Sequence, residues 1–188
     1  MGKDKAWLEI DGRPMIQRVI EELLRVTPTV SVIANGPEYE RLGWPVLPDL
    51  NAGIGPLEAI RVALEASLTP RVLLVACDLP FVTAELLEFL LDRVEGYQAT
   101  APMSPDGRLE PLCAIYSTDT LEHVTELIRS GERKVSRLFD RVRVRLIPFE
   151  DLSQLAGAER FFMNVNTPDD YVQAARTPPD DGPDDSEM

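Results

Sequence analysis

Cysteine and histidine are scarce in this chain, and their scarcity removes whole classes of chemistry. Two cysteines (Cys77 and Cys113) and one histidine (His123) are present among 188 residues. So few side chains of these types argue strongly against a zinc centre, and one isolated histidine supports no Ser–His–Asp or Cys–His nucleophile. Both cysteines lie in apolar, strand-like runs, which is typical of reduced core thiols in a cytosolic protein.

Long hydrophobic runs and an excess of basic residues are also absent. No apolar run approaches the length that spans a bilayer, and residues 1–5 do not lead into the apolar core of a signal peptide. The formal net charge of −13, from 19 basic and 32 acidic residues, argues against a general binder of nucleic acid or anionic membranes. We therefore expect a cytoplasmic protein with no nucleic-acid or membrane partner.

The chain does contain enough apolar sequence for one domain of ordinary size. Hydrophobic residues make up 44% of the sequence, which is sufficient for a full core. The exception is the segment 177–188, which carries several acidic residues and prolines and no base. Such a segment cannot bury apolar surface, so we expect a disordered acidic tail after a domain that spans residues 1–176.

Strand-like and helical patterns alternate along the first half of the chain. In order, they predict a helix over 14–26, strands at 30–34 and 46–47, a helix over 56–67, a strand over 72–77 and a helix over 83–94. Later patterns predict strands at 99–102, 109–116, 144–148 and 161–165, and a closing helix from Pro168. This order predicts a three-layer α/β domain with a mostly parallel sheet and right-handed crossovers.

The most informative segment is residues 72–80, Val-Leu-Leu-Val-Ala-Cys-Asp-Leu-Pro. Its aliphatic residues suit a strand buried on both faces of a sheet, and Pro80 forbids further ladder pairing. Asp78 therefore comes at the carboxyl end of a strand, where open α/β sheets bind ligands. A carboxylate there is a natural ligand for Mg²⁺ that carries a nucleotide's phosphates. The alternative is an ordinary aspartate that caps the following turn.

Four further features converge on this site, and three of them have a polar or charged side chain suited to a ligand. Asp49 precedes a glycine-containing loop that opens a helix, where backbone N–H groups favour an anion or a carbonyl-bearing base. Lys5 has a positively charged side chain, of the kind that stabilises the negative charge that develops during nucleotidyl transfer. Asn164 and Asn166, two residues apart at a strand end, offer paired amides to a polar ligand. Each feature also has a purely structural alternative. Asp49 would precede a plain helix cap, Lys5 would be a solvated surface lysine, and the two asparagines would form an Asx-turn before the closing helix.

The fourth feature is a pair of charges, and one further charged motif decides nothing by itself. Arg108 and Glu110, the fourth feature, bracket the start of a predicted strand, where ordinary surface charges are the default. Gly131, followed by Glu132-Arg133-Lys134, is typical of a helix C-cap with a basic turn that is able to meet an anion.

Taken in order, these motifs resemble the molybdenum cofactor guanylyltransferase family. The resemblance spans nearly the whole chain except the tail, and it depends on the ordered set rather than on one motif. The matching stretches are Met-Gly-Lys-Asp-Lys (1–5), Asp-Gly-Arg-Pro (11–14), Val-Ile-Ala-Asn (32–35), Pro-Asp-Leu (48–50), Gly-Pro-Leu (55–57), Cys-Asp-Leu-Pro (77–80), Leu-Glu-Pro-Leu (109–112), Gly-Glu-Arg (131–133) and Asn-Val-Asn-Thr-Pro (164–168).

The resemblance implies a Rossmann-like nucleotidyltransferase fold and transfer of GMP from GTP to molybdopterin, with release of pyrophosphate. It implies that Asp78 holds Mg²⁺ and that Lys5 contacts the phosphates, which suits a reaction driven by positioning and charge neutralisation. Other cofactor-biosynthesis proteins or molybdoenzymes are further candidate partners. The remaining implied site residues are Asn35, Asp49, Gly55 and Pro56 on the nucleoside side, and Asn164 and Asn166 on the molybdopterin side.

The chain departs from the family pattern at its start. Members normally have a buried strand and a glycine-rich loop directly before Met-Gly-x-x-Lys, and Met1 stands where the methionine of that loop's end would be. We therefore expect a sheet whose first strand is missing, through a start assigned too late or through a true truncation. A smaller departure is Glu58-Ala59, where the family usually has Ala-Gly.

Two other functions stay open at this point. A sister nucleotidyltransferase of the same fold would transfer CMP to molybdopterin or act on a sugar or polyol phosphate. A non-catalytic, truncated paralogue would bind the cofactor or assist its assembly. Nucleotide-dependent stabilisation separates them, because the first predicts a larger response to CTP or UTP than to GTP and the second a weak response.

Overall fold

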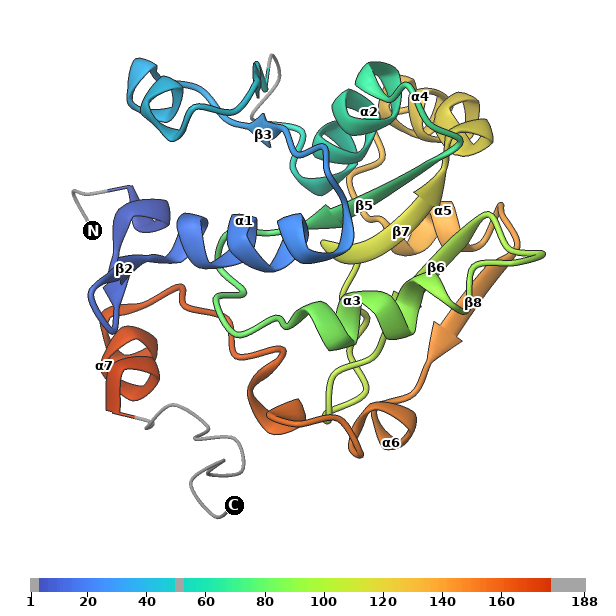
Figure 1. Ribbon diagram of the computed structural model, residues 1–188. Helices are drawn as coiled ribbons and strands as arrows, with labels where there is room; N and C mark the ends of the chain where they lie inside the picture. The colour runs from blue at the N-terminus through green and yellow to red at the C-terminus, as the bar shows by residue number, and fades with distance from the viewer. Residues whose placement is uncertain (1–3, 50–52, 177–188) are drawn as a thin grey trace.

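The computed structural model describes residues 4–49 and 53–176, which build a mixed four-stranded sheet (Figure 1). Its strand order is β5-β7-β6-β8. β7 is antiparallel to both neighbours, whereas β6 and β8 are parallel. Three of the four strands therefore run in one direction, which confirms the mostly parallel sheet, with β7 as the reversed strand. The bounds are β5 (Arg71–Val75), β6 (Ala99–Pro102), β7 (Cys113–Ser117) and β8 (Val144–Ile147).

Helices cover both faces of this sheet, so the three-layer prediction is confirmed (Figure 1). Leu73 and Val75 of β5 pack into a core cluster with residues of α1 and α3, whereas Val72 and Leu74 pack with residues of α2, α4 and α5. This alternation follows from the two-residue period of a strand. No described helix is long and apolar enough to cross a membrane. The helices are α1 (Met15–Val26), α2 (Pro56–Ala66), α3 (Ala84–Leu91), α4 (Leu121–Arg129) and α5 (Ser136–Phe139).

β5 has the composition of an interior strand but lies at an edge of the sheet. Among the described strands it pairs only with β7, and all five of its residues are half-buried. Because both faces of β5 pack against core clusters, its exposure comes from the open edge rather than from an uncovered face. The predicted cover of both faces is therefore present, while the second edge of the strand is unpaired.

Two small sheets stand apart from the main one. β3 (Val32–Ile33) and β4 (Val46–Leu47) form a parallel pair, and the short helix η2 (Pro37–Leu42) connects them. β1 (Glu9–Ile10) and β2 (Arg13–Pro14) form a hairpin. Its two-residue turn is Asp-Gly with positive φ at both positions, +52° and +74°, which is the type I′ combination that matches the twist of paired strands.

Between β8 and residue 176, where the described part of the chain ends, there are three short helical segments and no strand, so the strand predicted at 161–165 is wrong. Phe161 and Val165 are fully buried, but turn hydrogen bonds such as Met163 N to Arg160 O (3.0 Å) replace a ladder. The apolar run therefore reflects core packing and not pairing. The closing helix is confirmed, and the predicted tail at 177–188 lies outside the described residues. The segments are α6 (Phe149–Leu152), η4 (Ala158–Arg160) and α7 (Pro168–Arg176), with η3 (Thr118–Thr120) earlier, before α4.

Candidate active site

Three of the predicted site residues meet through one ammonium group. Lys5 Nζ donates to Asp78 Oδ2 at 2.8 Å and to Asn166 Oδ1 at 2.7 Å. The Lys5 side chain is 38% exposed and that of Asp78 17%, so the ion pair is shielded on one side and open to ligands on the other. The structure thus brings together a cation, an anion and an amide from the start, middle and end of the chain.

Lys5 is positioned by a short helical turn that its neighbour caps. It begins η1 (Lys5–Trp7), where the Asp4 carboxylate accepts a hydrogen bond from Ala6 N at 3.1 Å. The Tyr39 hydroxyl donates to the other oxygen of Asp4. Burial and the Asp4 carboxylate raise the pKa of Tyr39, so the hydroxyl keeps the proton that this bond requires. A capped turn anchored on η2 therefore fixes the backbone from which Lys5 extends.

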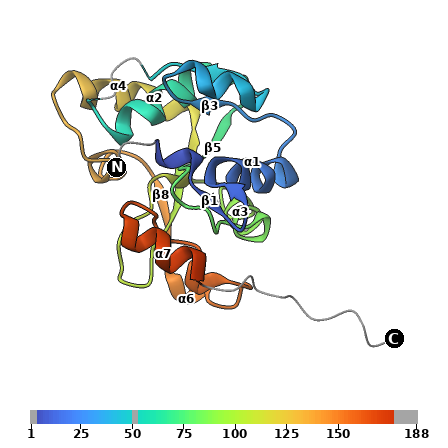
Figure 2. The same cartoon turned by 90° about the vertical axis from the view of Figure 1, so that its left-hand side faces the viewer.

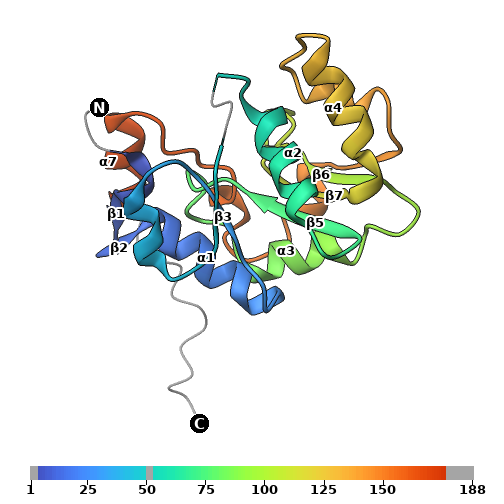
Figure 3. The ribbon, with the colours of Figure 1, turned by 90° about the horizontal axis from the view of Figure 1, so that it is seen from above.

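Asp78 and Asn166 are held together by the packing of both chain ends. The backbone N–H of Val165 donates to the Asp78 carbonyl at 3.0 Å, and this bond brings the neighbouring Asn166 to the end of β5. The Tyr171 hydroxyl of α7 donates to the Glu9 carbonyl of β1 at 2.7 Å. Figures 2 and 3 show α7 beside the β1–β2 hairpin. The two terminal segments thus close the site around Asp78.

Asn166 and Asn164 do not form the predicted pair of amides. Asn164 Nδ2 donates to the Phe162 carbonyl at 3.4 Å, whereas Asn166 accepts from Lys5. The two-residue period applies only in a strand, and this segment is not one. The Asp170 carboxylate accepts from the N–H groups of Asn166 (3.0 Å) and Thr167 (2.7 Å), and Thr167 Oγ1 accepts from Asp170 N (3.1 Å). The predicted cap of the closing helix is therefore present.

The predicted nucleoside residues form a second group. Asn35 follows β3 and donates from Nδ2 to the Asp49 carbonyl at 2.7 Å. Gly55 precedes α2 with φ of +85°, a conformation that a residue with a Cβ adopts only with strain, and Pro56 takes the first helical position. Among the described residues, no hydrogen bond joins this group to Lys5, Asp78 or Asn166.

Glu110, one of the four features expected to converge on Asp78, lies beside this site. The β5–β7 register pairs Val75 with Cys113, and Ala76 N donates to the Leu112 carbonyl at 2.7 Å. Beyond these pairs both chains leave the strands in turns, and Glu110 lies close enough to Asp78 for that carboxylate to affect its pKa. Burial, with Asp106 and Asp78 adding to it, raises the pKa of Glu110 to about 7 despite the nearby Arg108. Sequence propensity does not show this proximity, which comes from the turns that follow β5 and precede β7.

Glu110 gives the apo protein a pH-dependent stability. Its pKa rises on folding, from 4.5 to about 7, so the native state binds this proton more tightly than the unfolded chain. The free energy of unfolding is therefore expected to fall as pH rises from 4.5 to 7. Glu110→Gln should flatten that decline, measured by urea unfolding across the window. The exposed Glu95→Gln is the control, and an equal slope in wild type and Glu110→Gln would contradict the assignment.

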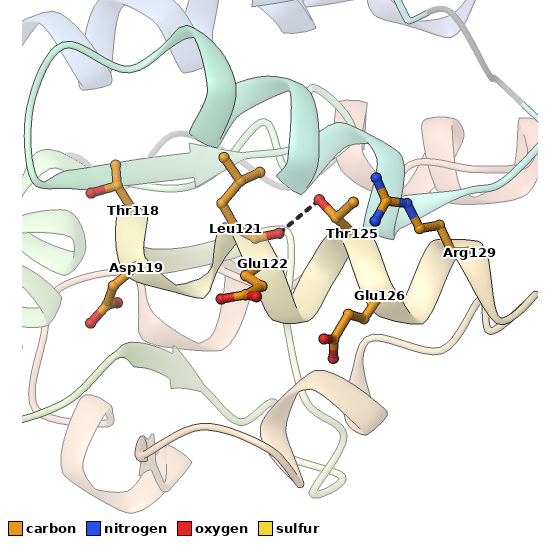
Figure 4. A pocket seen from close by; sticks show the side chains of 7 residues that line it. All are labelled: Thr118, Asp119, Leu121, Glu122, Thr125, Glu126 and Arg129. Carbon is orange, nitrogen blue, oxygen red and sulfur yellow. Dashed lines mark hydrogen bonds between the residues drawn. The ribbon is translucent and has the colours of Figure 1, made fainter.

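A shallow hollow of about 440 Å³ lies elsewhere, along the outer surface of η3 and α4 (Figure 4). Thr125 Oγ1 donates to the Leu121 carbonyl beneath it, at 2.8 Å. None of the predicted site residues contributes to this hollow. Its shape therefore gives no reason to move the candidate site away from Asp78. The lining residues are Thr118, Asp119, Leu121, Glu122, Thr125, Glu126 and Arg129.

A three-layer α/β sheet that places an aspartate and a lysine together beyond a strand's carboxyl end defines a Rossmann-like nucleotide-handling protein, of the nucleotidyltransferase class. Comparison with known families agrees with this class. The profile described as the MobA-like NTP transferase domain matches residues 1–146. The chain belongs to the MobA-like NTP transferase family.

Individual relatives extend over most of the chain. A protein of Pelotomaculum thermopropionicum named "Probable molybdenum cofactor guanylyltransferase" is 40% identical over 176 residues, covering 93% of this chain and 85% of the relative. The crystal structure of molybdopterin-guanine dinucleotide biosynthesis protein A from Archaeoglobus fulgidus is 28% identical in sequence, with a TM-score of 0.77. The match covers 93% of this chain and 90% of that one.

The fold is shared more widely than these two names. The crystal structure of 2-C-methyl-D-erythritol 4-phosphate cytidylyltransferase from Thermus thermophilus has a TM-score of 0.66 at 22% identity, covering 91% of this chain and 92% of that one. That likeness concerns the fold alone. The architecture therefore does not select the base of the nucleotide, which has to be argued from the site and tested.

Proposed function

We propose that this protein transfers GMP from GTP to molybdopterin, which gives the guanine dinucleotide cofactor and pyrophosphate. The observation that carries the proposal is the Lys5–Asp78–Asn166 network at the carboxyl end of β5. The guanylyltransferase name of a relative at 40% identity supports the choice of GTP and molybdopterin. Molybdoenzymes and other cofactor-biosynthesis proteins are the proposed partners, and the cytoplasm is the proposed location.

Asp78 is the proposed anchor for Mg²⁺. Among the described residues no cluster of three or more His, Cys, Asp or Glu forms a ready-made metal site. Mg²⁺ suits such a place, because it commonly binds through one or two carboxylates together with substrate phosphates and water. The two oxygens that hold the Lys5 ammonium, from Asp78 and Asn166, show that hard oxygen donors converge on a cation here. When bound, the metal neutralises phosphate charge.

The other proposed roles divide the site between its two substrates. Lys5 contacts the triphosphate and stabilises the charge that develops on it. Asn164 and Asn166 lie on the molybdopterin side, whose terminal phosphate is the attacking group, held in line with the α-phosphate of GTP. The residues proposed for the nucleoside side are Asn35, Asp49, Gly55 and Pro56.

Nucleotide-dependent stabilisation tests this proposal directly. In the presence of Mg²⁺, GTP should raise the melting temperature of the chain more than CTP or UTP at the same concentration, because a ligand stabilises the state that binds it. Conversion of GTP and molybdopterin to the dinucleotide, followed by chromatography, completes the test. A larger shift with CTP or UTP would identify a sister enzyme of the same fold. Absence of any shift would indicate a non-catalytic protein.

A further inference from the structure

An arginine far along the chain binds the segment before α2. Arg133, in the turn between α4 and α5, donates from its guanidinium Nη1 to the carbonyl oxygen of Gly53. The two residues are 80 positions apart, so only the packing of α4 on α2 makes the contact. Gly53 lies two residues before Gly55, which is one of the residues proposed to meet the nucleoside.

The turn that carries Arg133 is held by its own hydrogen bonds. Gly131, with φ of +81°, ends α4, and the N–H groups of Gly131 and Glu132 donate back to Ile128 O and Leu127 O at 3.0 Å each. This is the pattern of a Schellman cap. The Glu132 carboxylate accepts from the N–H of Arg133 at 2.8 Å and of Lys134 at 3.0 Å. These bonds lower the pKa of Glu132, which keeps the turn intact at neutral pH.

The contact has a definite effect on the peptide that follows Gly53. In a trans peptide the C=O and the next N–H point in opposite directions, so a Gly53 carbonyl directed at Arg133 turns the Ile54 N–H away from the α4–α5 turn. Gly53 itself lies in a hydrogen-bonded turn, and Gly55, with φ of +85°, leads from that turn into α2. The Arg133 contact therefore fixes the turn just before the positive end of α2, where an anion or a carbonyl-bearing base binds well.

We infer that Arg133 is a positioning residue for the nucleotide: it fixes the Gly53 peptide, and with it the turn that leads into the start of α2, where GTP is proposed to bind. The inference depends on the proposed function and adds to it a residue outside the predicted site. Arg133 acts through the backbone and not on the reacting phosphates. Its loss therefore weakens nucleotide binding and leaves the chemical step nearly unchanged.

The test compares Arg133→Ala, Arg133→Lys and the control Lys134→Ala, which removes the neighbouring cation of the same turn. Calorimetric titration with GTP and Mg²⁺ should show a Kd about tenfold higher for Arg133→Ala. Arg133→Lys should recover part of the affinity, because an ammonium still donates to a carbonyl. In steady-state transfer the KM for GTP should rise with kcat within about twofold of wild type, as expected when only binding is lost. Lys134→Ala should match wild type.

A second readout separates positioning from a general loss of structure. Without nucleotide, the melting temperature of Arg133→Lys should equal that of wild type, while the amide proton and nitrogen chemical shifts of Ile54 and Gly55 should change. Equal Kd values for wild type and Arg133→Ala would overturn the inference and leave the proposed function intact. A fall in kcat at unchanged Kd would also overturn it. Failure of the wild-type chain to bind GTP would instead refute the proposed function, and the inference with it.

Discussion

Replacing Asp78 with asparagine is expected to lower the rate of GMP transfer roughly a thousand-fold while the chain stays folded. The substitution keeps the size of the side chain and an oxygen that accepts from Lys5, which now lies 2.8 Å from the carboxylate. It removes the negative charge on which a divalent cation depends. The rate is measured as dinucleotide formed from GTP and molybdopterin, and Mn²⁺ binding in the presence of GTP is followed by electron paramagnetic resonance.

The matched control is Asp92→Asn, which makes the same chemical change at an exposed position after α3. Its transfer rate and Mn²⁺ binding should equal those of wild type. Retention of more than about a tenth of the wild-type rate in Asp78→Asn would show that this carboxylate is not the metal anchor. Loss of activity with undiminished Mn²⁺ binding would place the metal elsewhere as well.

Replacing Arg61 with methionine is expected to destabilise the fold by about 3–5 kcal/mol. Glu58, in the first turn of α2, is fully buried. Arg61 donates to its two carboxylate oxygens, from Nη2 at 2.7 Å and from Nε at 2.9 Å. Removing the arginine takes two hydrogen bonds and a positive charge away from a buried carboxylate, which costs far more than the loss of a surface pair. The loss is measured as the free energy of unfolding in urea.

Two further variants identify the cause of that loss. Glu65→Gln removes only the half-exposed partner of Arg61, so its effect should stay under about 1 kcal/mol. The double variant Glu58→Met with Arg61→Met should recover most of the stability, because apolar residues often replace a buried ion pair at little cost. A double variant no more stable than Arg61→Met would refute the account. The pair also explains the sequence: the unusual Glu58 is accompanied by the residue that neutralises it.

The sequence predicted most of the fold because its local signals agree with the tertiary structure. The strand at 99–102 and the closing helix from Pro168 appear where the patterns place them. Thr83, where the predicted helix over 83–94 begins, is the N-cap of α3 and accepts from Leu86 N at 3.3 Å. The strand at 161–165 failed, because burial of Phe161 and Val165 produces the same apolar run as pairing does. The reversed direction of β7 was also invisible, since strand propensity carries no direction.

The site was predictable where a motif carries its own chemistry. Lys5, Asp78 and Asn166 were identified as separate features, and the structure joins them with two hydrogen bonds. What the sequence could not show was contact between distant segments. The placement of Glu110 depends on the pairing of β5 with β7 and on the turns beyond it, and the bond from Arg133 to Gly53 depends on how α4 packs on α2. Both residues were noticed as charged motifs, but a charge without a neighbour suggests no role.

The reversal of β7 has a consequence for how members of this architecture diversify. Because β7 runs against β5 and β6, the stretch at 103–112 that leads into it emerges at the same rim as Asp78. A change of length or sequence in this stretch leaves every strand of the main sheet paired as before. The rim beside Asp78 is thus able to vary without loss of the scaffold, and relatives should differ more in this connection than in the strands that it joins.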